Sequence, residues 1–109
     1  LVRSGDYNVI AIDEGQFFPD LLETITTIMK MQRGLCIYVF GLDGDYKQAP
    51  FKDSKLLELI PYCHTVSKLL ARCYACQAPA PFTKRLVSSE EQILVGGVND
   101  YQPVCLTHL

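Results

Sequence analysis

Two pairs of potential metal ligands in the last third of the chain constrain its fold more than any other feature. Cys73 and Cys76 are separated by two residues, and the same spacing separates Cys105 from His108. Tight turns present such pairs, and two turns together complete a tetrahedron of three thiolates and one imidazole, as in a zinc ribbon. Because the protein would supply all the ligands, we predict a structural rather than a catalytic zinc site. A redox pair formed by Cys73 and Cys76, or a chance coincidence of spacings, is the alternative.

The segment that carries these pairs has too little apolar material for a core of its own. Prolines and glycines interrupt it at Pro79, Pro81, Gly96, Gly97 and Pro103. Small units of this kind need a cross-link such as a disulfide or a bound metal, and metal binding would supply folding energy. We therefore expect residues 73–109 to form a zinc-binding lasso subdomain, and residues 1–72 to belong to an α/β domain.

Composition and charge exclude several classes of protein. The chain has five cysteines, an odd number, and no visible secretory signal, so we expect a reducing compartment in which paired cysteines bind metal. Cys36 and Cys63 lie outside the pairs and are expected to be small core residues. The formal net charge of −2 argues against nucleic-acid binding, and no apolar run is long enough to cross a membrane.

The first part of the chain has the pattern of a strand, a helix and a second strand. Residues 9–12 are apolar, and a helix is expected to begin at Pro19-Asp20 and to end before Gly34. Residues 35–42 form a continuous apolar run, typical of a strand covered on both faces. This order predicts a parallel sheet with a right-handed crossover. A short helix at residues 54–60, stopped by Pro61, and a third strand at 66–72 are expected to follow.

Acidic residues come directly after the first predicted strand. Asp13 and Glu14 follow residues 9–12, as in a Walker B strand, where the first acid helps to hold Mg²⁺ near phosphates. The second acid can accept a proton from an attacking hydroxyl group. Ligands of open α/β sheets bind at the carboxyl ends of the strands, which is where these acids lie. A solvated strand end without a ligand is the alternative.

Several motifs in order resemble the C-terminal part of the cytosolic, zinc-containing thymidine kinases. The resemblance runs from about Asn8 to His108, nearly the whole chain. The motifs that carry it are Asp13-Glu14-Gly15-Gln16-Phe17-Phe18, Leu42-Asp43-Gly44-Asp45-Tyr46 with Pro50-Phe51, Cys73-x-x-Cys76, Thr83-Lys84-Arg85, Gly96-Gly97, Tyr101, and Cys105-x-x-His108. The resemblance implies an α/β fold with a P-loop NTPase-like parallel sheet and a zinc-ribbon lasso. It also implies a cytoplasmic enzyme, usually a homotetramer, with a homodimer as the alternative.

The resemblance further implies transfer of the γ-phosphoryl group of ATP to the 5′-hydroxyl of thymidine, with Mg²⁺. By this resemblance Glu14 is the general base and Asp13 helps to hold Mg²⁺. The residues expected against the nucleotide are Asp13, Glu14, Gly15 and Gln16. Those expected to wall the nucleoside pocket or contact the nucleoside are Phe17, Leu42, Tyr46, Phe51, Thr83 and Tyr101. The main chain of Gln92, Ile93, Leu94, Val95 and Gly96 is expected to hold the base, within a lid whose ends the zinc site anchors.

Four points leave alternatives open. The chain contains no G-x-x-x-x-G-K-[ST] motif, so by itself we expect it to be inactive in phosphoryl transfer. A non-catalytic relative and a zinc-ribbon interaction module are therefore competing hypotheses. Phe17 and Phe51 could be ordinary core residues, and Thr83 could bond a ligand or the backbone. The basic residues Lys84 and Arg85 could contact phosphate, or be solvated like most exposed basic residues.

Overall fold

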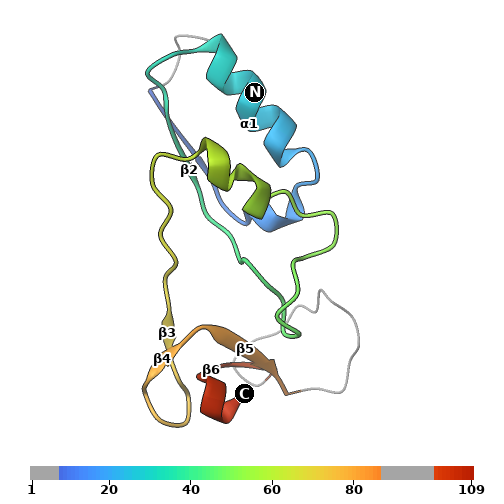
Figure 1. Cartoon of the computed structure of the whole chain (residues 1–109), viewed down its shortest axis with the longest axis vertical. Coiled ribbons are helices and arrows are strands. Elements are labelled where there is room, and N and C mark those ends of the chain that lie inside the picture. Colours follow the sequence, from blue (N-terminus) through green and yellow to red (C-terminus); the bar gives the residue numbers. More distant parts are fainter. Residues whose placement is uncertain (1–7, 87–99) are drawn as a thin grey trace. The chain divides into compact units, whose positions relative to one another are not determined.

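The computed structural model describes residues 8–86 and 100–109 (Figure 1). These residues divide into two compact units. The first comprises residues 8–43 and Phe51–His64, and the second comprises Gly44–Pro50 with residues 65–86 and 100–109. The division expected after residue 72 stays a prediction. No helix within the described ranges is long and apolar enough to cross a membrane.

A strand–helix–strand element forms the centre of the first unit. Strand β1 (Val9–Ile12) pairs in parallel with β2 (Cys36–Val39), and helix α1 (Leu21–Met31) connects them. The register places Val9 opposite Cys36 and Ile12 opposite Val39. The helix ends near Gly34, whose φ of 78° is a conformation that glycine adopts without a steric penalty. The predicted parallel strand–helix–strand unit is thus confirmed. The larger P-loop NTPase-like sheet stays a prediction, because the described residues contain only these two parallel strands.

Apolar side chains from three elements form the core of this unit. Leu21 and Ile25 of α1 pack with Leu59 of the 3₁₀ helix η2 (Leu57–Tyr62). Partly buried residues of β1 and β2 complete the cluster, among them Ile12 and Val39. Ile37 and Val39 are two residues apart along β2, and Ile12 lies opposite Val39, so these residues share one face of the sheet, toward the helices.

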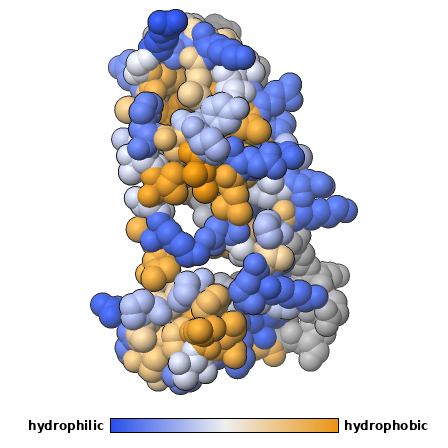
Figure 2. All heavy atoms as spheres, in the orientation of Figure 1, coloured by the Kyte–Doolittle hydropathy of each residue, from blue (hydrophilic) through white to orange (hydrophobic). Residues whose placement is uncertain are grey.

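The described residues cover only one face of the second strand, whereas the sequence predicted a strand covered on both faces. Exposure alternates along both strands, and Val9, Tyr38 and Phe40 are each more than half exposed, at 55%, 53% and 53%. Cys36 is also exposed, so its predicted core role is wrong here. The physical reason is that α1 and η2 both contribute to the same apolar cluster. Figure 2 shows apolar side chains exposed among hydrophilic ones on the visible side of the molecule.

Two further expectations for the middle of the chain are wrong. The helix expected to stop at Pro61 is the 3₁₀ helix η2, which contains that residue, because the fixed φ of proline suits a helical turn. Of the third strand expected at residues 66–72, only β3 (Ala71–Arg72) is present, and it pairs antiparallel with β4 (Pro79–Ala80). Cys63 is exposed rather than in the core, and its thiol donates a hydrogen bond to the Leu59 carbonyl at 3.2 Å.

Short antiparallel strands build the second unit. Strand β5 (Phe82–Arg85) pairs with β6 (Tyr101–Val104), with Phe82 opposite Val104 and Arg85 opposite Tyr101. The last element is the 3₁₀ helix η3 (Leu106–His108). The buried core is small, as the composition predicted, and consists of Cys73, Ala80 and Val104 with Phe82 and Cys105 packed against them.

Candidate functional site

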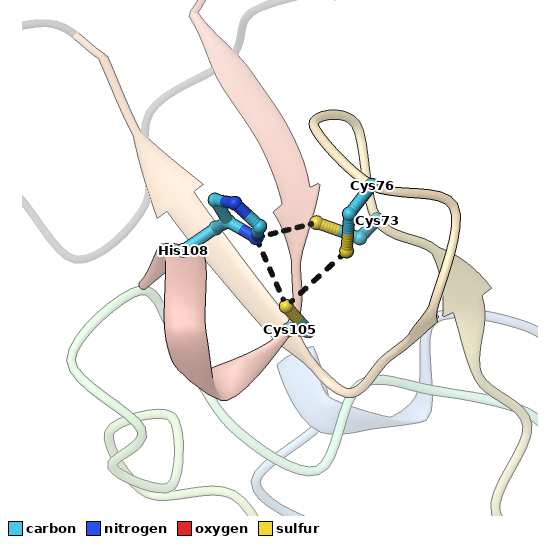
Figure 3. A group of neighbouring side chains, drawn as sticks. All are labelled: Cys73, Cys76, Cys105 and His108. Carbon is cyan, nitrogen blue, oxygen red and sulfur yellow. Dashed lines mark hydrogen bonds between the residues drawn. The ribbon is translucent and has the colours of Figure 1, made fainter.

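Two turns of the second unit bring the four predicted metal ligands together. Cys73 and Cys76 lie in the β3–β4 connection, which closes through hydrogen bonds from Cys73 N–H to the Ala78 carbonyl and from Gln77 N–H to the Cys73 carbonyl. Cys105 precedes η3 and His108 is its last residue, and the His108 N–H donates to the Cys105 carbonyl at 3.1 Å. The four side chains point toward one another (Figure 3), and their ligand atoms all lie within 4.8 Å of each other.

The distances between ligand atoms fit a tetrahedral zinc site. Cys76 Sγ lies 3.7 Å from Cys105 Sγ, and His108 Nδ1 lies 3.7 Å from Cys73 Sγ and 3.2 Å from Cys105 Sγ. Zinc bonds of ordinary length in a tetrahedron separate two sulfurs by about 3.8 Å and a sulfur from a nitrogen by about 3.6 Å. The side chains are therefore already spaced for a metal with three thiolate ligands and one imidazole ligand.

The local electrostatics favour thiolates at two of the three cysteines. Burial raises the pKa of Cys73, but hydrogen bonds from the backbone of Cys105 and Cys76 outweigh it and lower this pKa. Burial also raises the pKa of Cys105, and the His108 backbone N–H and the neighbouring thiols outweigh it, so this pKa is lowered too. The Ala78 backbone lowers the pKa of Cys76, but burial and the other two sulfurs raise it overall. A divalent cation would offset the repulsion between these sulfurs.

The four candidate ligands come from both strand pairs of this unit. Cys73 is fully buried between Ala80 and Val104, whereas Cys76 and His108 are exposed. The adjacent Tyr74 N–H donates to the Pro103 carbonyl of β6 at 2.8 Å. A metal here would tie the β3–β4 turn to the end of β6, and so replace the apolar core that the composition does not provide.

The acidic residues lie at the carboxyl end of β1, as predicted. Glu14 has a left-handed backbone, with φ of 53° and ψ of 43°, and its N–H donates to Asp13 Oδ1 at 2.9 Å. The next residue, Gly15, begins the 3₁₀ helix η1 (Gly15–Phe17), and its N–H donates to the Phe40 carbonyl beyond β2. Left-handed backbone is uncommon at a glutamate, and it occurs also at Gln48, Asp53 and Gln77. Both carboxylates are exposed, and so accessible to a ligand.

Gln16 connects this strand end to the end of β2. Its side chain is 1% exposed, and its Oε1 accepts a hydrogen bond from the Leu42 N–H at 3.1 Å. Gly41 makes room for it, because a Cβ at that position would lie 2.6 Å from Gln16 Oε1. Within the described part of the chain, Gln16 Nε2 has no hydrogen-bond partner. Two loops predicted to carry phosphate-side and nucleoside-side residues are thus joined by one buried carboxamide.

Aromatic rings lie next to this strand end. Phe17 and Phe51 pack edge to face, with ring centroids 5.4 Å apart and an interplanar angle of 79°. Phe51 is buried and Phe17 is 40% exposed. Such a pair can form one wall of an apolar pocket, and it also packs well as ordinary core.

Comparison with known proteins decides the family. The family model described as thymidine kinase matches residues 2–109. The chain belongs to the thymidine kinase family. It is 41% identical over 100 residues to the thymidine kinase of variola virus, and 42% identical over the same length to those of monkeypox virus and vaccinia virus (strain Western Reserve). These matches cover 92% of the chain and 54% of each relative, so the chain spans about half the length of these thymidine kinases.

The thymidine kinase residues predicted from sequence are distributed over both units. The first unit brings together the Asp13–Glu14 turn, Gln16 and Leu42, with Phe17 and Phe51 also in this unit. The second unit holds the metal ligands and also Tyr46, Thr83 and Tyr101. Thr83 is partly buried on β5, opposite Pro103. The predicted base-holding residues Gln92, Ile93, Leu94, Val95 and Gly96 lie outside the described residues.

Sequence reasoning missed one set of contacts in the second unit. The Arg85 guanidinium lies over the Tyr46 ring, 3.8 Å from its centroid, and 5.4 Å from the centroid of the Tyr101 ring. Only the β5–β6 register and the loop at residues 44–50 bring these groups together. Neither can be read from the Thr83-Lys84-Arg85 motif, which is why Arg85 was expected to bind phosphate or to be solvated.

Proposed function

We propose that the full-length protein is an enzyme that phosphorylates the 5′-hydroxyl of thymidine with ATP. Membership of the thymidine kinase family is the observation that carries this proposal. The geometry at the end of β1 supports it, because Asp13 and Glu14 are exposed at the strand end where ligands of α/β sheets bind. The phosphate-binding loop is then expected in the part of the protein that this chain does not include, within a P-loop NTPase-like sheet.

In this proposal Glu14 is the general base. The 5′-oxygen of thymidine forms a bond to the γ-phosphorus as the bond to the β,γ-bridging oxygen breaks, and Glu14 takes the hydroxyl proton. Asp13 is the residue that would hold Mg²⁺, which neutralises developing charge on the phosphates when it is bound. The left-handed backbone of Glu14 and the Gly15 hydrogen bond to Phe40 fix the direction of this turn.

The rest of the site is assigned by the same proposal. Phe17, Leu42, Tyr46, Phe51, Thr83 and Tyr101 are assigned to binding of the nucleoside. The main chain of residues 92–96 holds the base. The Cys/His cluster binds a structural zinc that anchors both ends of the segment between Cys76 and Cys105. A cytoplasmic homotetramer, or a homodimer, is the assembly that we propose.

A direct assay on the full-length protein tests the proposal. Thymidine, ATP and Mg²⁺ are incubated with the protein, and thymidine 5′-phosphate is separated by chromatography. We expect product with the wild type, and a loss of kcat of about 10²-fold or more for Glu14→Gln. Glu23→Gln, which changes an exposed acid in the first turn of α1, is the matched control and is expected to leave kcat unchanged. No product with the wild type would favour a non-catalytic relative, and an active Glu14→Gln variant would remove Glu14 as the base.

A further inference from the structure

A single arginine contacts two tyrosines of the proposed nucleoside site. The Arg85 guanidinium stacks on Tyr46, and its Nη2 donates a hydrogen bond to the Tyr101 hydroxyl at 3.1 Å. Its carbon Cζ also lies 5.4 Å from the Tyr101 ring centroid. The three side chains are all partly buried, and they come from segments far apart in the sequence. The planar guanidinium can use its face and its edge at once, which an ammonium group cannot.

The backbone around this cluster is held by contacts that do not involve the Arg85 side chain. Arg85 and Tyr101 are directly opposite in the β5–β6 pair, and the Leu86 N–H donates to the Asp100 carbonyl at 2.7 Å. The pair is therefore aligned by main-chain hydrogen bonds. A substitution of the Arg85 side chain should leave this strand pairing in place.

The loop that carries Tyr46 also closes on itself. Asp45 Oδ1 accepts hydrogen bonds from the N–H groups of Lys47 and Ala49, and the Asp45 N–H donates to the Ala49 carbonyl at 2.8 Å. The Gln48 side chain donates to the Tyr46 carbonyl. These bonds fix the loop backbone, but they leave the direction of the Tyr46 ring to its contacts. The Arg85 guanidinium lies on that ring, 3.8 Å from its centroid, and the Lys47 Nζ lies farther from the centroid, at 5.5 Å.

We propose that Arg85 is a positioning residue for the nucleoside, which sets the Tyr46 and Tyr101 rings in the orientation that thymidine binding requires. This inference rests on the proposed function, in which both tyrosines belong to the nucleoside site. It differs from a phosphate-binding role, because one edge of the guanidinium is bonded to Tyr101 and one face is stacked on Tyr46. Removing the guanidinium should therefore weaken thymidine binding and leave ATP binding unchanged.

Steady-state kinetics of the full-length protein separate these roles. For Arg85→Gln we expect the KM for thymidine to rise about 3- to 30-fold, the range of a lost cation–π contact, with the KM for ATP unchanged. Arg85→Lys keeps the charge but not the plane, so it should recover only part of the loss. Lys30→Gln is the control, since it removes the same charge from an exposed residue in the last turn of α1 and should change neither KM.

A double-mutant comparison tests the link to Tyr101. Tyr101→Phe keeps the ring and removes the hydroxyl that Arg85 bonds, so it should raise the KM for thymidine by itself. Combined with Arg85→Gln, it should add less than the product of the two single effects, because the variants share one contact. Zinc content, measured on each variant, should stay at the wild-type level, which a general loss of folding would not allow.

Each other outcome overturns the inference in a distinguishable way. A rise in the KM for ATP alone would make Arg85 a phosphate ligand, and no change in either KM would make it an ordinary surface residue. If Arg85→Gln does not fold, an unchanged thymidine KM for Arg85→Lys overturns the inference by itself. A wild type that neither binds nor phosphorylates thymidine overturns the proposed function and this inference together, whereas an active wild type with unaffected variants overturns only the inference.

Discussion

The buried Oε1 of Gln16 accepts the Leu42 N–H at 3.1 Å and so joins the end of β1 to the loop that follows β2. The two strands run in parallel, so their carboxyl ends lie at the same edge of the sheet. The hydrogen bond connects the turn of the proposed base, Glu14, to a residue of the proposed nucleoside wall. Stability and catalysis should therefore both depend on this contact.

Replacing Gln16 by methionine tests this connection. Gln16→Met keeps the length of the side chain but removes the acceptor of this partly buried hydrogen bond, which should lower the free energy of unfolding by about 1–3 kcal/mol. Chemical denaturation of the full-length protein measures it, with thymidine turnover as the second readout. Gln77→Met, at an exposed position, is the control. Equal unfolding free energies for the two variants would show that the Gln16 contact contributes nothing.

A substitution at Gly41 tests the same junction from the other side. The added Cβ of Gly41→Ala would lie 2.6 Å from Gln16 Oε1 and 2.9 Å from Leu56 Cδ2, so the side chains must shift. We expect a loss of about 1–3 kcal/mol in the free energy of unfolding. Gly44→Ala is the matched control, because its nearest atoms are at 3.6 Å, and it should change stability by less than about 0.5 kcal/mol. A Gly41→Ala variant as stable as the Gly44→Ala variant would contradict the close packing described.

Removing the metal should unfold the second unit preferentially. Its buried core is small, and metal binding energy is folding energy in such units. We expect a chelator to lower Tm, and Cys73→Ser to reproduce that loss without chelator. Cys36→Ser, at an exposed cysteine outside the cluster, should behave like the wild type. After chelation, amide hydrogen exchange should increase in β3–β6 but not in α1, which would locate the unfolding in the second unit. An equal increase in both units would contradict preferential unfolding of the second.

Zinc retention should weaken as the pH falls. The lowered pKa values of Cys73 and Cys105 extend the range in which these thiols are ionised, but protons still compete with the metal for all three sulfurs. Retention should therefore rise with pH and level off once the thiols are ionised. A chromophoric zinc chelator, added across a pH series, measures release. Release that does not change with pH would contradict thiolate ligation.

The identity of the fourth ligand can be tested at His108. Its Nδ1 lies 3.2 Å from Cys105 Sγ and 3.7 Å from Cys73 Sγ, which places the imidazole at one corner of the tetrahedron. His108→Cys should keep stoichiometric zinc, because a thiolate is an equally good ligand, whereas His108→Ala should bind zinc more weakly. Zinc affinity, measured by competition with a chelator of known affinity, gives the ranking. An unchanged affinity for His108→Ala would remove His108 from the site.

The parts of the fold that follow local patterns were predictable from sequence. Apolar spacing and the glycine at position 34 identified β1, α1 and β2, since each depends on residues close in the chain. The metal ligands were predictable because tight turns fix short spacings. The prediction of a strand over residues 66–72 was wrong. An apolar run forms a strand only where a partner strand can pair with it, and β4 pairs with Ala71 and Arg72 alone.

Long-range contacts explain what the sequence could not reveal. Arg85 reaches Tyr46 and Tyr101 only through strand register and a distant loop, neither of which a motif encodes. The exposure of Cys36 depends on what covers the second face of the sheet, and the described residues place α1 and η2 in a single cluster. Gln16 could be singled out from its motif, but its hydrogen bond with Leu42 could not be predicted, because it joins the ends of two different strands.

Zinc content of the purified chain tests the central claim most directly, since the ligand spacing, the interatomic distances and the thiol chemistry of the Cys/His cluster all favour zinc binding. Elemental analysis after extensive dialysis should give about one zinc per chain, as expected for a closed site of four protein ligands. The same analysis of Cys73→Ser should give a much lower content, and Cys36→Ser should match the wild type. A folded wild-type protein without stoichiometric zinc would contradict the account.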